Sequence, residues 1–232
     1  MFARIVDLTH TISAGAPTFD DSEILSVRTV ASYDTHGCFA REIALPEHFA
    51  THVDAPAHFT RDAWTVDTIP VERLVRPLAV LDVSTQVENN PDYTVRLVDI
   101  AAWETIHSRI PPAAVVMAHT GWDRRWNSPE SYRNMDLNGV RHFPGFSLEA
   151  AQFLTDERDA AGLGIDTLSV DAGYATDFPV HHYTASRGVY HLEAVANLDQ
   201  VPATGATVVV APAKLLGGSG GPVRLFALIH SI

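Results

Sequence analysis

The chain contains a single cysteine, Cys38, and only three methionines among its 232 residues. One cysteine cannot form a disulfide within the chain, and a metal site built from several thiolates is excluded as well. An isolated cysteine is more often an incidental thiol than a nucleophile. The chemistry of this protein therefore has to rest on other side chains.

Basic residues are also scarce: 16 Lys and Arg stand against 28 Asp and Glu, a formal net charge of -12. This balance argues against nucleic acid or an anionic membrane as the main partner, because both require a basic surface. No apolar run approaches the ~20 residues of a membrane-spanning helix. The N-terminal stretch MFARIVDLTHTIS lacks the apolar core of a signal peptide, so we expect a cytoplasmic protein.

Short apolar runs indicate a sheet. They are rich in Val, Ile and Leu and are bounded by Gly, Pro or Asn, which is typical of buried strands. The predicted strands are 4–9, 77–84, 113–120, 164–171, 206–215 and 223–232.

Two helices are predicted between the strands. Within 95–110, Ile100, Trp103 and Ile106 share one stripe, and the helix ends before Pro111. Within 147–162, Ser147 can cap the start and Gly162 can close the end.

Strands and helices alternate without a linker or an internal repeat. We therefore expect one α/β domain over residues 1–232, with a mixed sheet. The turn-rich stretch 127–146 is long for a plain connection, and it is either a loop near a site or a surface excursion.

Histidine is unusually frequent, with twelve in the chain, and three of them lie in the stretch EHFATHVDAPAHF. Pro56 pushes the residue before it toward an extended backbone, in which alternate side chains share a face. His52, Asp54 and His58 then point the same way, and His48 can join them. Imidazole and carboxylate together suit Zn, Mn or Fe, so the spacing predicts a metal site.

A second group of candidate ligands lies between residues 177 and 198: His181, His182, His191 and Glu193. Spacing alone does not choose among them, and a local hydrogen bond explains His182 or His191 better than metal binding does. Three aspartates nearby could orient a ligand imidazole, although caps and turns explain them equally well: Asp166, Asp171 and Asp177.

The stretch HFATHVDAPAH resembles the H-x-G-T-H-x-D-x-P-x-H signature of the cyclase-like metal-dependent hydrolases, the group of bacterial kynurenine formamidase and isatin hydrolase. Three further stretches resemble the same family: IVDLTHTISAGAPTF, AHTGW and GGSGGPVRLFALI. The resemblance implies a swivelling β/β/α domain that forms dimers or higher homo-oligomers, with an N-terminal arm closing the neighbouring site. It also implies a small-molecule substrate and one or two divalent ions, Zn or Mn.

The resemblance assigns roles by position. His48, His52 and Asp54 match the ligands of the first metal, with Asp54 placed to bridge to a second. His181 and Glu193 match the distal ligands. The remaining motif residue, His58, matches the imidazole that accepts and donates protons.

Two features of the motif bear on the substrate. Ala50 stands where the signature has glycine, so a methyl group can reshape the pocket. Glu193 is the carboxylate of formamidase-type members, whereas isatin hydrolases tend to carry an amide, which favours an arylformamidase. Aromatic residues near the motifs either pack in the core or line an aryl pocket: Phe49, Phe59, Trp64, Trp122 and Phe178.

Two alternatives remain. The first is a sister enzyme that opens a cyclic amide such as isatin. The second is a non-catalytic module stabilised by its metal, but such a site would be closed, without an extra imidazole such as His58 beside it.

Overall fold

Strands dominate the chain, and most of them belong to one sheet. The computed structural model describes residues 2–20 and 25–231. The strands are β1 Phe2–Asp7, β2 Ser26–Ala31, β3 Ala40–Ala44, β4 His52–Asp54, β5 Val75–Asp82, β6 Thr94–Val95, β7 Val115–His119, β8 Gly145–Phe146, β9 Gly162–Ile165, β10 Tyr190–Glu193, β11 Ala206–Pro212 and β12 Gly220–His230. The helices are α1 Tyr33–His36, α2 Ser84–Asn89, α3 Leu97–His107, α4 Pro129–Arg133, α5 Leu148–Asp156 and α6 Pro179–Ala185.

The main sheet closes on itself. Its strand order is β1-β12-β11-β5-β7-β9-β10-β4, and β12 also pairs with β4, so seven strands form a barrel with β1 attached outside the ring. Strands β5, β7, β9 and β10 run parallel to one another, whereas the remaining pairs are antiparallel. The predicted α/β fold with a mixed sheet is confirmed.

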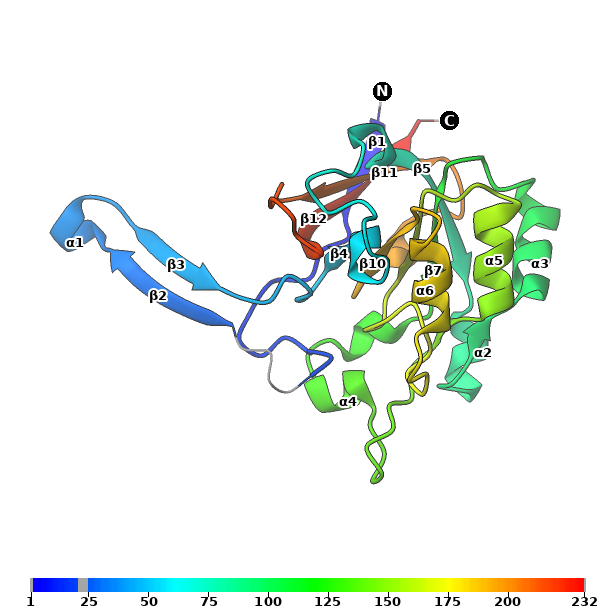
Figure 1. Ribbon diagram of the computed structural model, residues 1–232, viewed down its shortest axis with the longest axis horizontal. Coiled ribbons are helices and arrows are strands. Elements are labelled where there is room, and N and C mark those ends of the chain that lie inside the picture. Colours follow the sequence, from blue (N-terminus) through cyan, green and yellow to red (C-terminus); the bar gives the residue numbers. More distant parts are fainter. Residues whose placement is uncertain (1, 21–24, 232) are drawn as a thin grey trace.

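Side-chain alternation along the strands separates two cores. On β7, Val115 and Met117 belong to one apolar cluster, and Val116 and Ala118 belong to the other. The second cluster also contains residues of α3 and α5, which cover this face of the barrel. In Figure 1, α2, α3 and α5 lie on one side of the barrel, and the β2–β3 hairpin projects from the opposite side.

The predicted strands are all present, with different ends. The main correction concerns 164–171, where β9 begins at Gly162 and stops at Ile165. Beyond it, buried Thr167 donates a side-chain hydrogen bond to the carbonyl oxygens of Pro144 and Ser169.

The predicted helices are correct in place but not in detail. Ser147 caps α5 as expected, accepting a hydrogen bond from the backbone of Ala150, but the helix ends at Asp156. Gly162 therefore starts β9 and does not close a helix, which corrects the prediction. In α3, Ile100 and Trp103 are buried as predicted. Ile106 is 75% exposed, so the prediction that it shares their buried stripe is wrong.

Several elements escaped prediction. The short strands β4 and β10 and the helix α6 carry polar residues, and the β2–β3 hairpin lacks a buried face. The stretch 127–146 contains α4 and β8, and its Arg141 contacts the N-terminal segment at Phe19. Among the described residues, no helix has the length and apolar character needed to cross a membrane.

The seam between β12 and β4 leaves no room for a side chain at Gly220. A Cβ there would lie 2.5 Å from the carbonyl oxygen of Val53 and 2.6 Å from Cε1 of His48. We expect Gly220→Ala to lower the free energy of unfolding by about 1–3 kcal/mol, as overpacking does. The adjacent Gly221→Ala is a matched control, because nothing lies within 4 Å of its Cβ position. Equal midpoints of urea unfolding for the two variants would contradict this view of the seam.

Candidate metal centre

Two neighbouring strands present the centre of the site. On β4, Val53 points into the barrel core, so His52 and Asp54 on either side of it point outward. Strand β10 pairs with β4 so that His191 lies opposite Asp54 and Glu193 opposite His52. Four ionisable side chains therefore share one patch on the outside of the barrel.

The other predicted residues come from flanking segments. His48 precedes β4, and His181 lies on α6. The extended backbone predicted for 48–58 is correct only for β4, because Pro56 starts a short 3₁₀ turn that ends at His58. All six predicted site residues nevertheless line one pocket of about 310 Å³.

Asp54 is the centre of this group. Its carboxylate is 2% exposed. Oδ1 lies 2.6 Å from Nδ1 of His48 and 3.2 Å from Nε2 of His52, and Oδ2 lies 3.3 Å from Nε2 of His181. The second carboxylate, Glu193, lies 3.4 Å from Nε2 of His52 and 3.1 Å from Nε2 of His181.

Outer hydrogen bonds fix the tautomers of His52 and His181. Nδ1–H of His52 donates to the carbonyl oxygen of Ala50 at 2.9 Å, and Nδ1–H of His181 donates to Asp171 at 2.7 Å. A carbonyl oxygen and a carboxylate oxygen can only accept these hydrogen bonds, so the ring proton lies on Nδ1 in both histidines. In the neutral ring, Nε2 of each histidine therefore directs a lone pair at the carboxylates.

The orientation of His48 follows from the same reasoning. The hydroxyl of Ser219 donates to Glu47 at 2.6 Å and so accepts from Nε2–H of His48 at 2.9 Å. Nδ1 of His48 is then the bare nitrogen, and it faces Asp54.

Buried acceptors that face one another require a cation between them. No Lys or Arg in the described part of the chain forms an ion pair with Asp54 or Glu193. The donor atoms also cluster in threes, each set within 4.8 Å, and all three sets share Asp54. Imidazoles held by outer carbonyl and carboxylate groups are typical of metal ligands, so these residues fit a divalent ion such as Zn or Mn.

Protons take the place of the cation when no metal is bound. Burial alone would lower the pKa of His52, but hydrogen bonds to Asp54 and Glu193 raise it to about 10. Burial and the charge of Asp54 would raise the pKa of Glu193, but His181 and His52 lower it to about 2. The site therefore binds positive charge in either form.

His58 is the most exposed of the six residues and differs from the others. Its ring stacks on His48 with 3.9 Å between centroids. Although one edge of the ring is exposed, packing against His48 and Phe59 partly desolvates it and lowers the pKa of His58 to about 4, and the Asp54 charge only partly opposes this shift. His58 is therefore a neutral base near pH 7.

Ala50 has a left-handed backbone, with φ of 55°. This conformation is one that glycine adopts freely and that costs alanine about 1 kcal/mol. It lets the carbonyl oxygen of Ala50 accept a hydrogen bond from Nδ1–H of His52, while the methyl group of Ala50 lines the pocket.

The pocket wall is aromatic. Of the five predicted aromatic residues, only Phe59 and Phe178 line it. Phe49 and Trp122 are core residues, and Trp64 lies beneath the guanidinium of Arg73.

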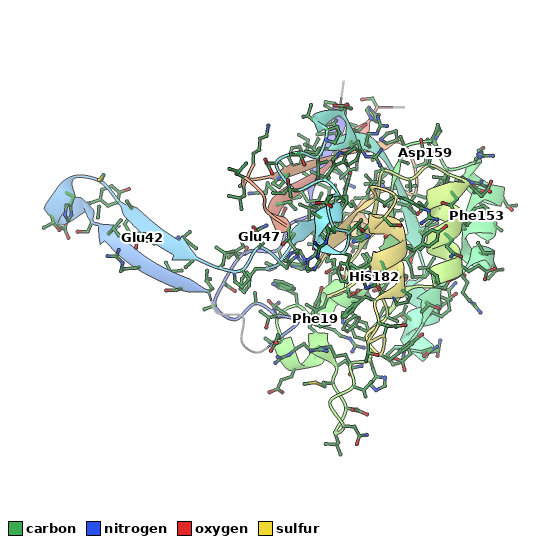
Figure 2. The ribbon with its side chains drawn as sticks, in the orientation of Figure 1. Phe19, Glu42, Glu47, Phe153, Asp159 and His182 are labelled. Carbon is green, nitrogen blue, oxygen red and sulfur yellow. The ribbon has the colours of Figure 1, made fainter. Side chains whose placement is uncertain are left out.

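Sequence reasoning missed Phe19, which is labelled in Figure 2. It belongs to the N-terminal loop and also lines the pocket. Its backbone carbonyl accepts a hydrogen bond from Arg141 at 2.6 Å. The guanidinium lies 4.1 Å from the ring centroid. The only available signal was that Phe19 ends the stretch IVDLTHTISAGAPTF.

The other candidates fall into place separately. Asp171 orients His181, whereas Asp166 accepts hydrogen bonds from Thr120 and Trp122, and Asp177 is exposed. His182 is exposed on α6 (Figure 2), with its ring against the edge of Phe59. His191 is 1% exposed and makes the local hydrogen bond that was considered for it, with Thr184.

A pocket with converging imidazoles and carboxylates, a neutral imidazole at its rim and an aromatic wall is typical of a metal-dependent enzyme that acts on small molecules. Comparisons with known proteins agree with this class. The "Cyclase" family model matches residues 6–172. The chain belongs to the cyclase family.

Three relatives illustrate the similarity. The chain is 31% identical to isatin hydrolase of Roseibium aggregatum, covering 97% of this chain and 92% of that protein. It is 25% identical to kynurenine formamidase of Salinibacter ruber, covering 95% of each. The structure of isatin hydrolase A from Ralstonia solanacearum matches with a TM-score of 0.93 and 36% identity, covering 98% of this chain and 92% of that one.

The raised pKa of His52 predicts how the metal-free protein responds to pH. The unfolded pKa is 6.5 and the folded one about 10, so its contribution to stability is complete below pH 6.5 and is lost as the pH rises toward 10. We expect the free energy of unfolding of metal-free protein to fall between pH 7 and 9, by up to about 1.4 kcal/mol per pH unit. Bound Zn should reduce this slope. Urea unfolding at each pH measures it, and a flat metal-free profile would contradict the assignment.

Proposed function

We propose that the protein is a metal-dependent hydrolase that cleaves a small aryl amide. The observation that carries this proposal is the set of bare imidazole nitrogens that face Asp54 and Glu193 at the base of an aromatic pocket. Membership of the cyclase family supports it, because the relatives named above are isatin hydrolases and a kynurenine formamidase.

The ligand sets follow the resemblance. His48, His52 and Asp54 would hold one ion, and Asp54, His181 and Glu193 would hold a second. When bound, such an ion would polarise the carbonyl group of the substrate and lower the pKa of a bound water molecule to roughly 7.

His58 moves the proton. Its neutral ring at the pocket rim accepts a proton from the attacking water at its free nitrogen and returns it to the leaving nitrogen of the substrate. The stacked ring of His48 opposes a lasting positive charge on His58, so the proton is passed on and not retained. Phe59 and Phe178 hold the aryl ring against this proton donor and exclude water.

Two substrates are candidates, each favoured by a different observation. A cyclic aryl amide such as isatin is favoured by similarity, because the isatin hydrolase relative is 31% identical and the matched structure 36%. An aryl formamide such as N-formylkynurenine is favoured by the carboxylate of Glu193. We place the cyclic amide first, because the similarity spans nearly the whole chain whereas the second argument rests on one residue.

We also propose a homodimer or higher homo-oligomer formed through the β2–β3 hairpin. The hairpin projects from the barrel (Figure 1), and an isolated two-stranded ribbon is marginally stable in water. Val27 and Ile43 pair on one face and are about half exposed. A second copy of the chain is the partner that would cover them.

Turnover of isatin and of N-formylkynurenine by metal-stripped protein, reloaded with Zn or Mn, tests the proposed function. We expect activity only after reloading and a higher kcat/KM for isatin. Preference for the formamide would reverse the order of the two substrates. A folded protein that binds metal but hydrolyses neither would favour a non-catalytic module.

Alanine substitutions at His58 and Asp54 should separate the loss of catalysis from the loss of metal binding. We expect His58→Ala to keep its metal and lose about 10²–10⁴ in kcat, the usual contribution of a proton-transferring side chain. Asp54→Ala should lose both metal and activity, because every ligand cluster includes Asp54. Metal content and kcat are measured on the same samples, and near wild-type turnover of His58→Ala would refute its role.

We expect Ile43→Asp to reduce the mass of the assembly measured by sedimentation. A carboxylate on the apolar face of the hairpin would be buried in the interface without an opposite charge, which is unfavourable. Glu42→Gln is the matched control, because Glu42 lies on the other face, paired with Arg28. An unchanged mass for Ile43→Asp would exclude this face as the interface.

A further inference from the structure

We propose that His191 is an additional ligand of the second ion, alongside Asp54, His181 and Glu193. The inference rests on the proposed function, because it concerns the same metal centre. Neither the resemblance nor the sequence spacing assigned a role in metal binding to His191.

The tautomer of His191 follows from Thr184. The hydroxyl of Thr184 lies 2.7 Å from the carbonyl oxygen of Val180, which cannot donate, so the single hydroxyl proton must lie in that contact. The same hydroxyl lies 2.6 Å from Nε2 of His191 and can only accept there. The proton of the neutral His191 ring is therefore on Nε2.

Nδ1 of His191 is consequently a bare acceptor. It is buried and has no hydrogen-bond partner, and it lies 3.8 Å from Oδ2 of Asp54, which is itself an acceptor. Two lone pairs facing each other in a dry interior are unfavourable unless a cation lies between them. His191 thus repeats the arrangement of His52 and His181, in which an outer bond fixes one nitrogen and the other faces a carboxylate.

The separations suit a shared ion. Two ligand atoms, each ~2.1 Å from one tetrahedral ion, lie ~3.4 Å apart. Oδ2 of Asp54 is 3.3 Å from Nε2 of His181 and 3.8 Å from Nδ1 of His191, and the donor atoms of the three residues lie within 4.8 Å of one another. All three side chains are buried.

This ligand set gives the two ion positions different characters. Glu193 lies between them, 3.4 Å from His52 and 3.1 Å from His181. The position beside His191 is formed by buried side chains alone, whereas the first position includes His48, whose side chain is 22% exposed. The first position therefore faces substrate, and the second supports Asp54.

The test compares two histidine-to-leucine substitutions on metal-reconstituted protein. We expect wild-type protein to retain two Zn ions per chain after dialysis, and His191→Leu to retain one. The affinity of the second position should fall at least about 100-fold, beyond the 10–100-fold loss that follows removal of an outer partner. His182→Leu, which changes an exposed histidine on α6, should retain both ions.

Anomalous scattering at the Zn edge from crystals of the wild-type protein needs no variant. We expect a peak ~2.1 Å from Nδ1 of His191. The role of His191 would be overturned if folded His191→Leu retained two ions. It would also be overturned if the wild-type protein held one ion, at His48, His52 and Asp54. Either outcome would leave the proposed function standing. A folded wild-type protein that binds no ion would overturn both.

Discussion

The buried carboxylate of Asp54 is the constraint on which the rest of the site depends. Imidazole nitrogens of three other residues surround it, and each is turned toward it by a bond made on its far side: Ala50 for His52, Asp171 for His181 and Ser219 for His48. A negative charge in this environment is tolerated only with a cation beside it. The residues around the site are therefore arranged to bind positive charge.

The barrel supplies the positions of these groups. Strand alternation buries Val53 and Leu192 in the barrel core, which forces their neighbours in sequence onto the outer face. Antiparallel pairing of β4 with β10 then sets the ligands opposite one another in register. Helix α6 covers this patch and adds His181. The polar centre thus shares its backbone with an apolar core, and a shift of one residue in either strand would exchange the two faces.

Much of this arrangement was readable from the sequence, for reasons that differ between elements. The long strands were predicted because they are runs of Val, Ile and Leu, which in β7 and β9 are buried on both faces. The histidines of the motif were identified because their spacing is local. Phe19 was missed, and His191 was named only as one candidate among four, because both depend on contacts with residues more than a hundred positions away. Strand β10 escaped because polar residues interrupt its apolar pattern, and β4 was predicted only as part of a longer extended segment. Helix α5 ends at Asp156, and Gly162 begins β9.

The closure of the barrel by β12 also sets an order of events during synthesis. Strand β4 leaves the ribosome early, but its two neighbours are β10 at Tyr190–Glu193 and β12 at Gly220–His230. Until those residues emerge, His52 and Asp54 have no sheet to hold them, and loop closure over such lengths is slow. Assembly of the ligand set is therefore among the last steps of folding, and the nascent chain presents its histidines only as an open, weakly binding segment. Any metal that these residues bind would therefore be acquired by the nearly completed chain.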